Sequence, residues 1–314
     1  MDEFEVVVAE RKDAAAGVVT LLLQNPNGSD LPTWAPGAHI DVVLTAELIR
    51  QYSLCGDPSD RRTWRIAVLL EPDGRGGSSY VHTQIRAGDK LCIRGPRNNF
   101  ALEPSPRYRF IAGGIGITPI LPMIAAVENA GADWTLHFGG RTRQSMAFLD
   151  ELTKNGQGVV VHPQDSLGYL NLDSAIGDPT PDTLIYCCGP SSLITAVEER
   201  CRAWPEGALH VERFQADPSP TAGEAQQFFI EIGSTGERFS VPADRSALSV
   251  LRENGIDVLS SCEEGVCGTC ETRVISGAID HRDSLLTDEE KDENSTMMVC
   301  VSRAASGETV VLDL

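Results

Sequence analysis

The sequence predicts three consecutive domains: an antiparallel β-barrel, an α/β domain built on a parallel sheet, and a small domain that carries clustered cysteines. Residues 1–106 hold many short strand patterns without helices, whereas residues 107–214 alternate strand and helix patterns. Residues 226–314 follow a proline-containing linker and include three closely spaced cysteines and a fourth after 29 intervening residues. A chain of 314 residues is long enough for two average domains or three small ones.

Apolar, β-branched runs recur through the first 106 residues, and turn signals such as Asn25–Gly28 and Pro36–Gly37 separate them. Many short strands without intervening helices indicate a small antiparallel barrel. The expected strands are residues 4–8, 18–23, 39–44, 50–54, 65–70 and 90–93.

The pattern changes in residues 107–214, where helical patterns fall between short apolar strand patterns. This alternation predicts a parallel sheet that is covered by helices on both faces. The expected strands are residues 109–112, 135–138, 159–162, 183–187 and 209–211. The expected helices are residues 120–129, 147–154 and 193–204.

Residues 215–225 contain two prolines and no large apolar side chain, which is the composition of a linker. Beyond the linker, residues 228–232 and 238–241 are expected to form a strand pair. Residues 247–254 are expected to form a helix that ends at Gly255. A cysteine-rich loop and further short strands complete this last domain.

The net charge of −19 argues against a nucleic-acid backbone or an anionic membrane as the partner. Residues 226–314 hold 17 acidic and 7 basic side chains, a net charge of −10. This excess is either plain solvation or a docking face for a protein partner. No apolar run approaches the ~18 residues of a membrane span, and the N-terminus lacks a secretory pattern. A cytoplasmic protein is therefore expected.

Nine cysteines, an odd number, in a sequence without an export signal do not indicate a disulfide scaffold. Four of them have the spacing C-x4-C-x2-C…C of a plant-type [2Fe–2S] site: Cys262, Cys267, Cys270 and Cys300. Gly265 and Gly268 would let one loop wrap closely around a cluster. The alternatives are unrelated buried cysteines or a zinc site, although zinc usually takes two paired half-sites.

The other five cysteines are Cys55, Cys92, Cys187, Cys188 and Cys201. All except Cys188 are expected to be small buried hydrophobic residues. Cys188 belongs to the segment Tyr186–Ser191, which ends a predicted strand. A second such segment, residues 111–120, reads as a buried strand, a glycine-rich turn and a helix start. Thr118 suits the N-cap of that helix and Pro119 its first position. Both segments lie at carboxyl ends of strands, where open parallel sheets bind ligands.

The predicted barrel also has two candidate binding segments. In the strand 50–54, Arg50 and Tyr52 are expected to point to one face, and Ser53 to the other unless the strand bulges. The loop Gly74–Ser79 precedes an apolar stretch and can offer backbone N–H groups and hydroxyls to a phosphate.

Taken together, these segments resemble the ferredoxin–NADP reductase superfamily, and more closely the phthalate dioxygenase reductase group. That group includes vanillate demethylase reductases and the reductase parts of some self-sufficient cytochromes P450. The resemblance covers nearly the whole chain, in the order FMN-binding barrel, NAD-binding α/β domain and C-terminal plant-type ferredoxin of the β-grasp fold. It is carried by the segments RQYSL, GRGGSSYVH, GGIGITP, YCCGP and SCEEGVCGTC.

The resemblance implies a role for each matching residue. Arg50 would meet the FMN phosphate, Tyr52 would pack on the isoalloxazine ring, and Ser53 would lie near flavin N5. Ser53 and Cys188 are the implied catalytic residues. The implied phosphate pocket is completed by Gly76, Gly77, Ser78 and Ser79. The implied dinucleotide site is lined by Gly113, Gly114, Gly116, Thr118 and Pro119, with Cys188 and Gly189 beside the nicotinamide. Phe214 would lie near the flavin.

The implied activity is electron transfer from NADH through FMN and a [2Fe–2S] cluster to a separate oxygenase. A flavin is needed between the two because nicotinamide gives up two electrons and the cluster accepts one. NADH is expected to be preferred, but Arg141, Arg143 and Ser145 follow the second strand of the α/β domain, where arginines can accept the 2′-phosphate of NADPH.

Several alternatives stay open at this point. The flavin could be FAD, or the chain could be an electron-carrying module without turnover, or a redox sensor. For the acceptor, a Rieske-type aromatic oxygenase or demethylase is favoured over a cytochrome P450. The protein is expected to act as a monomer.

Overall fold

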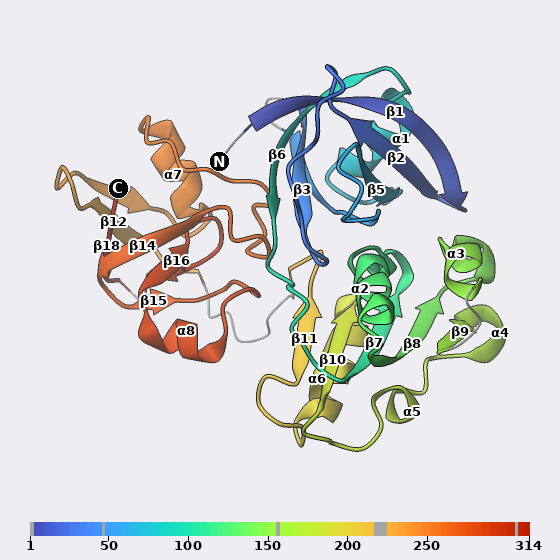
Figure 1. Ribbon diagram of the computed structural model, residues 1–314. Helices are drawn as coiled ribbons and strands as arrows, with labels where there is room; N and C mark the ends of the chain where they lie inside the picture. The colour runs from blue at the N-terminus through green and yellow to red at the C-terminus, as the bar shows by residue number, and fades with distance from the viewer. Residues whose placement is uncertain (1–2, 46–47, 155–157, 217–224, 305–306) are drawn as a thin grey trace. The chain divides into compact units, whose positions relative to one another are not determined.

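The computed structural model describes residues 3–45, 48–154, 158–216, 225–304 and 307–314. The chain divides into two compact units, Met1–Phe214 and Gln215–Leu314. The first unit contains the predicted barrel and the predicted α/β domain, and the second contains the four spaced cysteines (Figure 1). Most of the predicted linker 215–225 lies outside the described residues.

The N-terminal part of the first unit is a six-stranded antiparallel sheet in the order β4-β3-β6-β1-β2-β5. A bridge between Leu54 and Ile66 joins the two edge strands, so the sheet closes on itself as predicted. One helix, α1 (Gly77–Gln84), follows β5. The strands are β1 (Glu3–Ala15), β2 (Val18–Gln24), β3 (His39–Thr45), β4 (Leu48–Ser53), β5 (Thr63–Leu69) and β6 (Lys90–Arg97).

Alternation of side chains builds the interior of this barrel. Val6, Leu21, Ile40 and Ile93 come from four different strands and are fully buried in one cluster. Strand β1 is longer than the predicted residues 4–8, because its first residues pair with β6 and its later residues pair with β2. The second half of β1 is polar, so a search for apolar strand patterns does not detect it.

The rest of the first unit is a five-stranded parallel sheet in the order β11-β10-β7-β8-β9. The first strand, β7, lies in the middle between β10 and β8, so the chain reverses its direction of progress there. Such a switch point is where open α/β sheets bind ligands. The strands are β7 (Arg107–Gly113), β8 (Asp133–Gly140), β9 (Val159–Pro163), β10 (Thr183–Cys188) and β11 (Leu209–Glu212).

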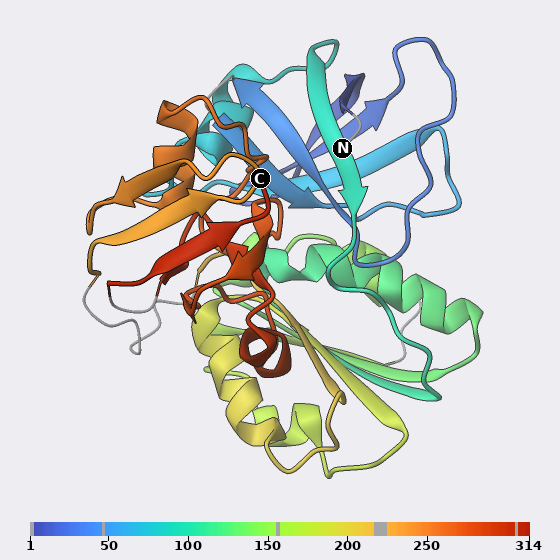
Figure 2. The same cartoon turned by 90° about the vertical axis from the view of Figure 1, so that its left-hand side faces the viewer.

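Helices cover both faces of this sheet, as predicted (Figure 2). Phe110 of β7 packs in the cluster with α2 and α3, and its neighbour Ile111 packs in the cluster with α5 and α6. Neighbouring strand residues therefore serve opposite faces. The helices are α2 (Ile117–Asn129), α3 (Leu149–Thr153), α4 (Gln164–Leu167), α5 (Leu172–Ile176) and α6 (Ser191–Cys201), with 3-10 turns η1 (Gly114–Gly116) and η2 (Arg143–Ser145).

The second unit is a five-stranded mixed sheet in the order β13-β12-β18-β14-β16, with a separate pair β15-β17. Phe228, Ile230, Leu248, Leu251 and Val310 form part of its core, which joins helix α7 to the sheet. Its elements are β12 (Phe228–Ile232), β13 (Arg238–Val241), α7 (Ala247–Glu253), β14 (Glu271–Ser276), β15 (Ile279–Asp280), α8 (Asp288–Glu293), β16 (Thr296–Met298), β17 (Arg303–Ala304) and β18 (Thr309–Leu312). None of the described helices is both long and apolar enough to cross a membrane.

Candidate functional site

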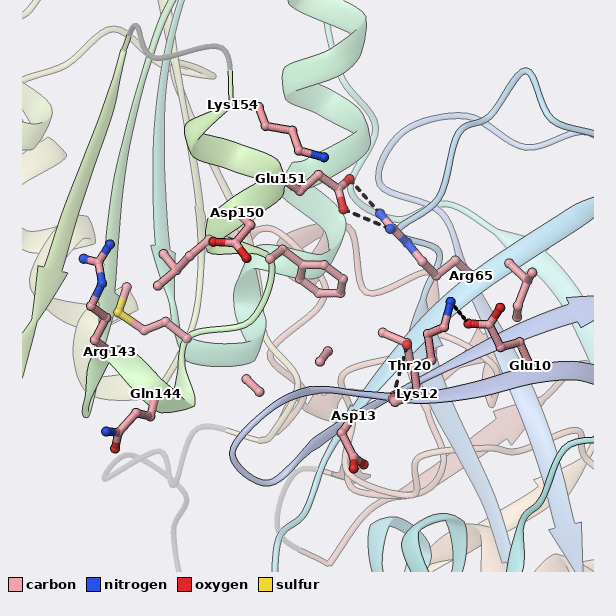
Figure 3. Close-up of a pocket in the computed structure, with 16 residues that line it drawn as sticks. Glu10, Lys12, Asp13, Thr20, Arg65, Arg143, Gln144, Asp150, Glu151 and Lys154 are labelled. Atoms are coloured by element: carbon pink, nitrogen blue, oxygen red, sulfur yellow. Dashed lines mark hydrogen bonds and ion pairs between the residues drawn. The ribbon is translucent and has the colours of Figure 1, made fainter.

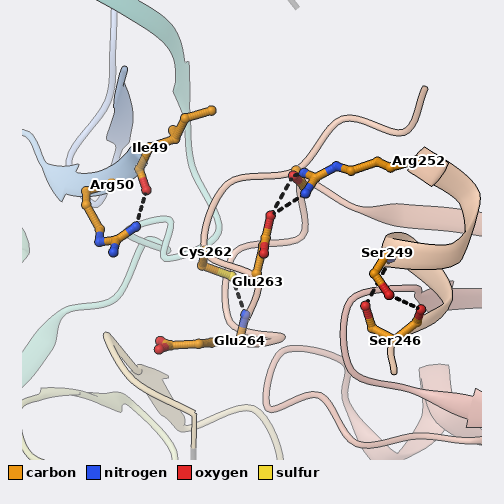
Figure 4. Close-up of polar contacts among 9 residues, drawn as sticks. Ile49, Arg50, Ser246, Ser249, Arg252, Cys262, Glu263 and Glu264 are labelled. Atoms are coloured by element: carbon orange, nitrogen blue, oxygen red, sulfur yellow. Dashed lines mark hydrogen bonds and ion pairs between the residues drawn. The ribbon is translucent and has the colours of Figure 1, made fainter. Parts of the chain in front are cut away.

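Strand β4 and the start of α1 bring the two barrel segments together. A Cβ atom on Gly77 would lie 2.4 Å from Cγ of Arg50, so only glycine lets the helix start approach this arginine. The Arg50 guanidinium donates to the carbonyl of Ile49 at 2.8 Å (Figure 4). It also donates to the carbonyl of Arg75 at 2.6 Å. Gly76, the N-cap, has φ +82°, which favours glycine. A cation beside a helix N-terminus is suited to an anionic phosphate.

The two hydroxyls of this loop differ in their surroundings. The Ser78 hydroxyl accepts from the backbone N–H of Glu71 at 3.0 Å, so it already stabilises the loop itself. The carbonyl of Ser79 accepts from the Thr83 hydroxyl in the first turn of the helix. The loop is therefore held in shape by its own hydrogen bonds, with Ser79 partly exposed.

Tyr52 and Ser53 point to opposite faces of β4. Tyr52 pairs with Ile40 of β3 and packs against the barrel core, and burial raises the pKa of its phenol. Ser53 pairs with His39 of the same strand. The Ser53 hydroxyl is buried and has no hydrogen-bond partner among the described residues. A buried, unsatisfied hydroxyl is costly and fits a polar ligand edge such as that of a flavin.

The two glycine-containing segments of the α/β domain pack directly on each other at the switch point. A Cβ atom on Gly116 would lie 2.3 Å from the carbonyl oxygen of Cys188, and one on Gly189 would lie 3.0 Å from Cα of Gly113. A Cβ atom on Gly113 would also meet Pro190 at 2.7 Å. The structure thus packs the two predicted dinucleotide segments against each other at the carboxyl ends of β7 and β10.

The predicted N-cap at Thr118 is wrong. Helix α2 begins at Ile117, and the residue before it is Gly116, because the turn η1 runs straight into the helix. The Thr118 hydroxyl donates back to the carbonyl of Ile115 at 2.9 Å and is buried. Thr118 and Pro119 therefore lie inside the first helical turn, and their backbone supports the glycine turn from within.

Sequence reasoning missed Glu212, which lies next to Cys188 across the pair β10–β11. Its carboxyl oxygen Oε2 is buried without a hydrogen-bond partner among the described residues, and burial raises the pKa of this carboxyl to about 8. The Cys188 thiol is fully buried; burial, and then the charge of Glu212, raise its pKa well above the ordinary value. At neutral pH both groups are therefore protonated, so the site offers neutral hydrogen-bond donors rather than a thiolate nucleophile. The signal in the sequence that could have pointed to Glu212 is its position at the end of a short strand pattern.

We expect Glu212→Gln to change how stability depends on pH. A carboxyl whose pKa rises to about 8 on folding keeps its proton in the native state while the unfolded chain loses it above about pH 4.3. Wild-type stability should fall as pH rises from about 4.3 to 8 and then level off, whereas glutamine carries no such penalty.

Thermal unfolding should show equal stability of the two proteins near pH 4. By pH 8 the variant should be more stable by on the order of 5 kcal/mol. Glu206→Gln, an exposed residue, is the matched control and should follow wild type. Parallel pH profiles of wild type and Glu212→Gln would show that the carboxyl is ionised in the native state.

The loop after β8 carries the residues predicted to select between dinucleotides. Thr142 and Ser145 cap each other around η2, and the Arg141 carbonyl accepts from the backbone of Asp165 at 3.1 Å. Both Arg141 and Arg143 are exposed. The loop therefore has a fixed backbone with two arginine side chains that can reach solvent.

An open cavity of about 800 Å³ lies between the β1–β2 hairpin and the segment that follows β8. Arg65 of the barrel donates to both oxygens of Glu151 on α3 at 2.9 Å, at the edge of this cavity (Figure 3). Arg143 and Lys154 add further positive charge to its lining. Of the predicted cofactor-binding residues, the cavity lining contains Arg143, which is predicted to meet a 2′-phosphate, and not those predicted to contact the flavin or the nicotinamide ring.

The cysteine loop of the second unit requires unusual backbone conformations. Glu263, Gly265 and Gly268 all have positive φ, at 56°, 72° and 71°. Glu263 is held there by Arg252 of α7, which donates to its carboxylate at 2.8 Å (Figure 4). The backbone N–H of Glu264 points at the sulfur of Cys262, 3.3 Å away. Such N–H groups stabilise thiolate ligands.

The four predicted ligand thiols are all buried and meet in two pairs, Cys262 with Cys267 and Cys270 with Cys300. Among the described residues, no three His, Cys, Asp or Glu side chains converge closely enough to hold a single metal ion. Two pairs of thiols fit two irons better than one tetrahedral zinc. The chemistry and arrangement of these donors therefore fit a [2Fe–2S] cluster.

Phe214 follows β11 at the end of the first unit and is partly exposed. Cys55, Cys187 and Cys201 are buried and Cys92 is half-buried, without disulfides.

Two family models match the chain. The 2Fe-2S iron–sulfur cluster binding domain matches residues 230–305, and the oxidoreductase NAD-binding domain matches residues 110–199. A vanillate O-demethylase oxidoreductase of Pseudomonas putida is 39% identical over 317 residues, which cover 99% of both chains.

Two solved structures extend this likeness over the whole fold. Phthalate dioxygenase reductase, described as a modular structure for electron transfer from pyridine nucleotides to [2Fe-2S], matches with a TM-score of 0.75 and 36% identity. The match covers 99% of this chain and 98% of that one. An intact type IV self-sufficient cytochrome P450 monooxygenase matches with a TM-score of 0.90 and 42% identity, covering 99% of this chain and 41% of that one.

Proposed function

This chain belongs to the phthalate dioxygenase reductase family, and from that premise we propose that it carries FMN and passes electrons from NADH to a Rieske-type oxygenase. That the chain is an NAD-binding, [2Fe–2S] oxidoreductase of the oxygenase-reductase type follows from its family. The identity of the flavin, the residues that hold each group and the acceptor are the parts proposed. The proposed domains are residues 1–106, 107–214 and 226–314, with 215–225 as linker.

The observation that carries the proposal is that one chain combines three candidate binding sites. They are a flavin site, a dinucleotide site and an iron–sulfur site. A bound flavin supplies the exchange between two-electron and one-electron chemistry. The chain's own contribution is to hold and orient. Arg50 and the start of α1 suit the flavin phosphate, and the free Ser53 hydroxyl suits the polar edge of its ring.

Gly113, Gly116 and Gly189 let the ends of β7 and β10 pack closely together, and the glycine-rich turn between β7 and α2 suits the pyrophosphate of a dinucleotide. Next to it, the carboxyl of the half-buried Glu212, whose pKa is raised to about 8, and the thiol of the buried Cys188 are protonated at neutral pH and can donate hydrogen bonds to a neutral amide. In the second unit, the four thiols hold the cluster.

The test is to purify the protein anaerobically and identify what it binds. FMN should be released on heating, and the reduced protein should show the paramagnetic signal of one [2Fe–2S] cluster. Release of FAD would overturn the flavin assignment, and a protein with neither flavin nor iron would overturn the function.

A cytochrome P450 is the second candidate acceptor, favoured by the match to the self-sufficient monooxygenase. Coupled turnover with purified oxygenases of both classes separates the two. We also propose that the reductase acts as a cytoplasmic monomer, because a net charge of −19 keeps copies of the chain apart. Its molar mass in solution, measured by light scattering, tests this.

NADH is expected to give a higher kcat/KM than NADPH, with NADPH still accepted. The exposed Arg143 is the group that would meet a 2′-phosphate, so Arg143→Ala should lower kcat/KM for NADPH about tenfold and leave that for NADH unchanged. Arg202→Ala, another exposed arginine of the same domain, is the control. A wild-type preference for NADPH that disappears in Arg143→Ala would reverse the cofactor assignment.

Partner docking is expected to weaken with salt. Helix α8 exposes five acidic side chains and one lysine, within a domain of net charge −10. Raising ionic strength from about 50 to 200 mM should lower kcat/KM for the oxygenase several-fold, because exposed charges are screened. The double variant Asp288→Asn, Asp292→Asn should flatten this dependence. A rate indifferent to salt would contradict docking by charge.

A further inference from the structure

A buried carboxylate lies directly behind the cysteine loop of the second unit. The Asp283 side chain is fully buried and accepts hydrogen bonds from the backbone of Leu285 (3.3 Å) and Leu286 (2.9 Å). Its other oxygen accepts from the Ser302 hydroxyl at 3.3 Å, and Nδ1 of His281 lies 3.6 Å away. Several donors around one carboxyl are what a buried negative charge requires.

Asp283 is packed against the loop that carries the first three cysteines. A Cβ atom on Gly265 would lie 3.1 Å from Cα of Asp283, so this glycine allows the close approach. The next residue, Ser284, donates its backbone N–H to the Gly265 carbonyl at 3.0 Å. Gly265 lies between Cys262 and Cys267 in the sequence.

The same carboxylate also contacts the segment that carries the fourth cysteine. Ser302 is two residues beyond Cys300, and its hydroxyl both donates to Asp283 and accepts from the backbone of Arg282 at 3.1 Å. A Cβ atom on Gly265 would also meet Val301, at 2.6 Å. Asp283 therefore ties together two segments that are more than 30 residues apart in the sequence and that together supply all four thiols.

The hydrogen bonds described for Arg282 and Arg303 go to acceptors other than Asp283. Arg282 donates to Asp280 at 2.8 Å, and Arg303 donates to the backbone carbonyls of Arg245, Gln226 and Pro242. The hydrogen bonds to Asp283 come from N–H and O–H dipoles, with the His281 ring 3.6 Å away, so the carboxylate lies close to the two cysteine-bearing segments without a lysine or arginine hydrogen-bonded to it among the contacts described. In a poorly screened interior, a nearby negative charge opposes the addition of an electron.

Resting on the proposed assignment of the four cysteines as cluster ligands, we propose that Asp283 is a positioning residue that also lowers the reduction potential of the [2Fe–2S] cluster. The hydrogen bond to Ser302 supplies the positioning, and the carboxylate charge supplies the effect on the potential. The two contributions can be separated, since one variant removes the charge and another removes only the hydrogen bond.

The test compares three variants of the full-length, cluster-loaded protein. Asp283→Asn keeps the size of the side chain and removes the charge, Ser302→Ala removes the hydrogen bond and keeps the charge, and Asp292→Asn removes an exposed charge as the control. The readouts are the midpoint potential of the cluster in a dye-equilibrated titration and the rate of iron loss to a chelator.

Asp283→Asn should shift the midpoint potential to a more positive value, while Ser302→Ala and Asp292→Asn stay close to wild type. Ser302→Ala should lose iron several-fold faster than Asp292→Asn. An unchanged potential in Asp283→Asn, or an equal shift in Asp292→Asn, would overturn the proposal.

If Asp283→Asn cannot hold a cluster, iron loss from Ser302→Ala decides the question: faster loss supports the role of Asp283, and wild-type retention overturns it. A wild-type protein that binds no iron would instead refute the assignment of the cysteines, which is a separate failure.

Discussion

Replacing Cys267 with serine is expected to abolish electron delivery to one-electron acceptors while reduction of the bound flavin by NADH continues. Cys267 is buried beside Cys262, so serine would remove one of the two thiols that we propose hold the same iron. An alkoxyl group is a poor replacement for a thiolate in an iron–sulfur site. The residues that we propose hold the dinucleotide and the flavin all lie in the first unit, so their folding does not depend on this thiol.

The measurement has two parts. Stopped-flow mixing with NADH should bleach the flavin at a rate within about twofold of wild type, and turnover with the oxygenase should fall by more than about 100-fold. Cys201→Ser, a buried cysteine on α6 outside the cluster loop, is the control and should retain both activities. Normal oxygenase turnover in Cys267→Ser would mean that electrons leave the protein without passing through the cluster.

The folded arrangement of the barrel and of the parallel sheet could be predicted because their strands are short apolar runs with clear turns. The strand ends were less predictable. The second half of β1 is polar, and only its pairing with β2 makes it a strand. The sequence predicts Thr118 as an N-cap. Helix α2 begins earlier, at Ile117, because the residues directly before the helix, Gly114–Gly116, already form a 3-10 turn.

Prediction of the candidate site from the sequence is limited in the same way. The cysteines are recognisable from spacing alone, because a cluster dictates how far apart its ligands can be. Glu212 and Asp283 carry no such spacing. Glu212 matters because β11 pairs with β10 beside Cys188, and Asp283 matters because its segment folds back on Gly265. Both depend on contacts between segments distant in the sequence, which a single sequence does not specify.

Gly116→Ala is expected to damage dinucleotide use more than any other single methyl group added to the first unit. Its φ of −61° is ordinary for alanine, so backbone strain is not the cause. The added Cβ would lie 2.3 Å from the carbonyl oxygen of Cys188 and 2.5 Å from its carbon. These are backbone atoms, which cannot rotate away as a side chain can. The segments after β7 and β10 must therefore move apart.

Moving those segments apart would widen the surface that we propose holds the dinucleotide, and kcat/KM for NADH should fall about 100-fold, or about 2.7 kcal/mol. Ferricyanide reduction measures it without the oxygenase. Gly131→Ala is the control: it follows α2, has φ +71° and no neighbour within 4 Å, so it should cost stability but not kcat/KM. If Gly116→Ala kept wild-type kcat/KM at normal folding, the contact between the two segments would be packing alone, and the dinucleotide site would have to lie elsewhere on the sheet edge.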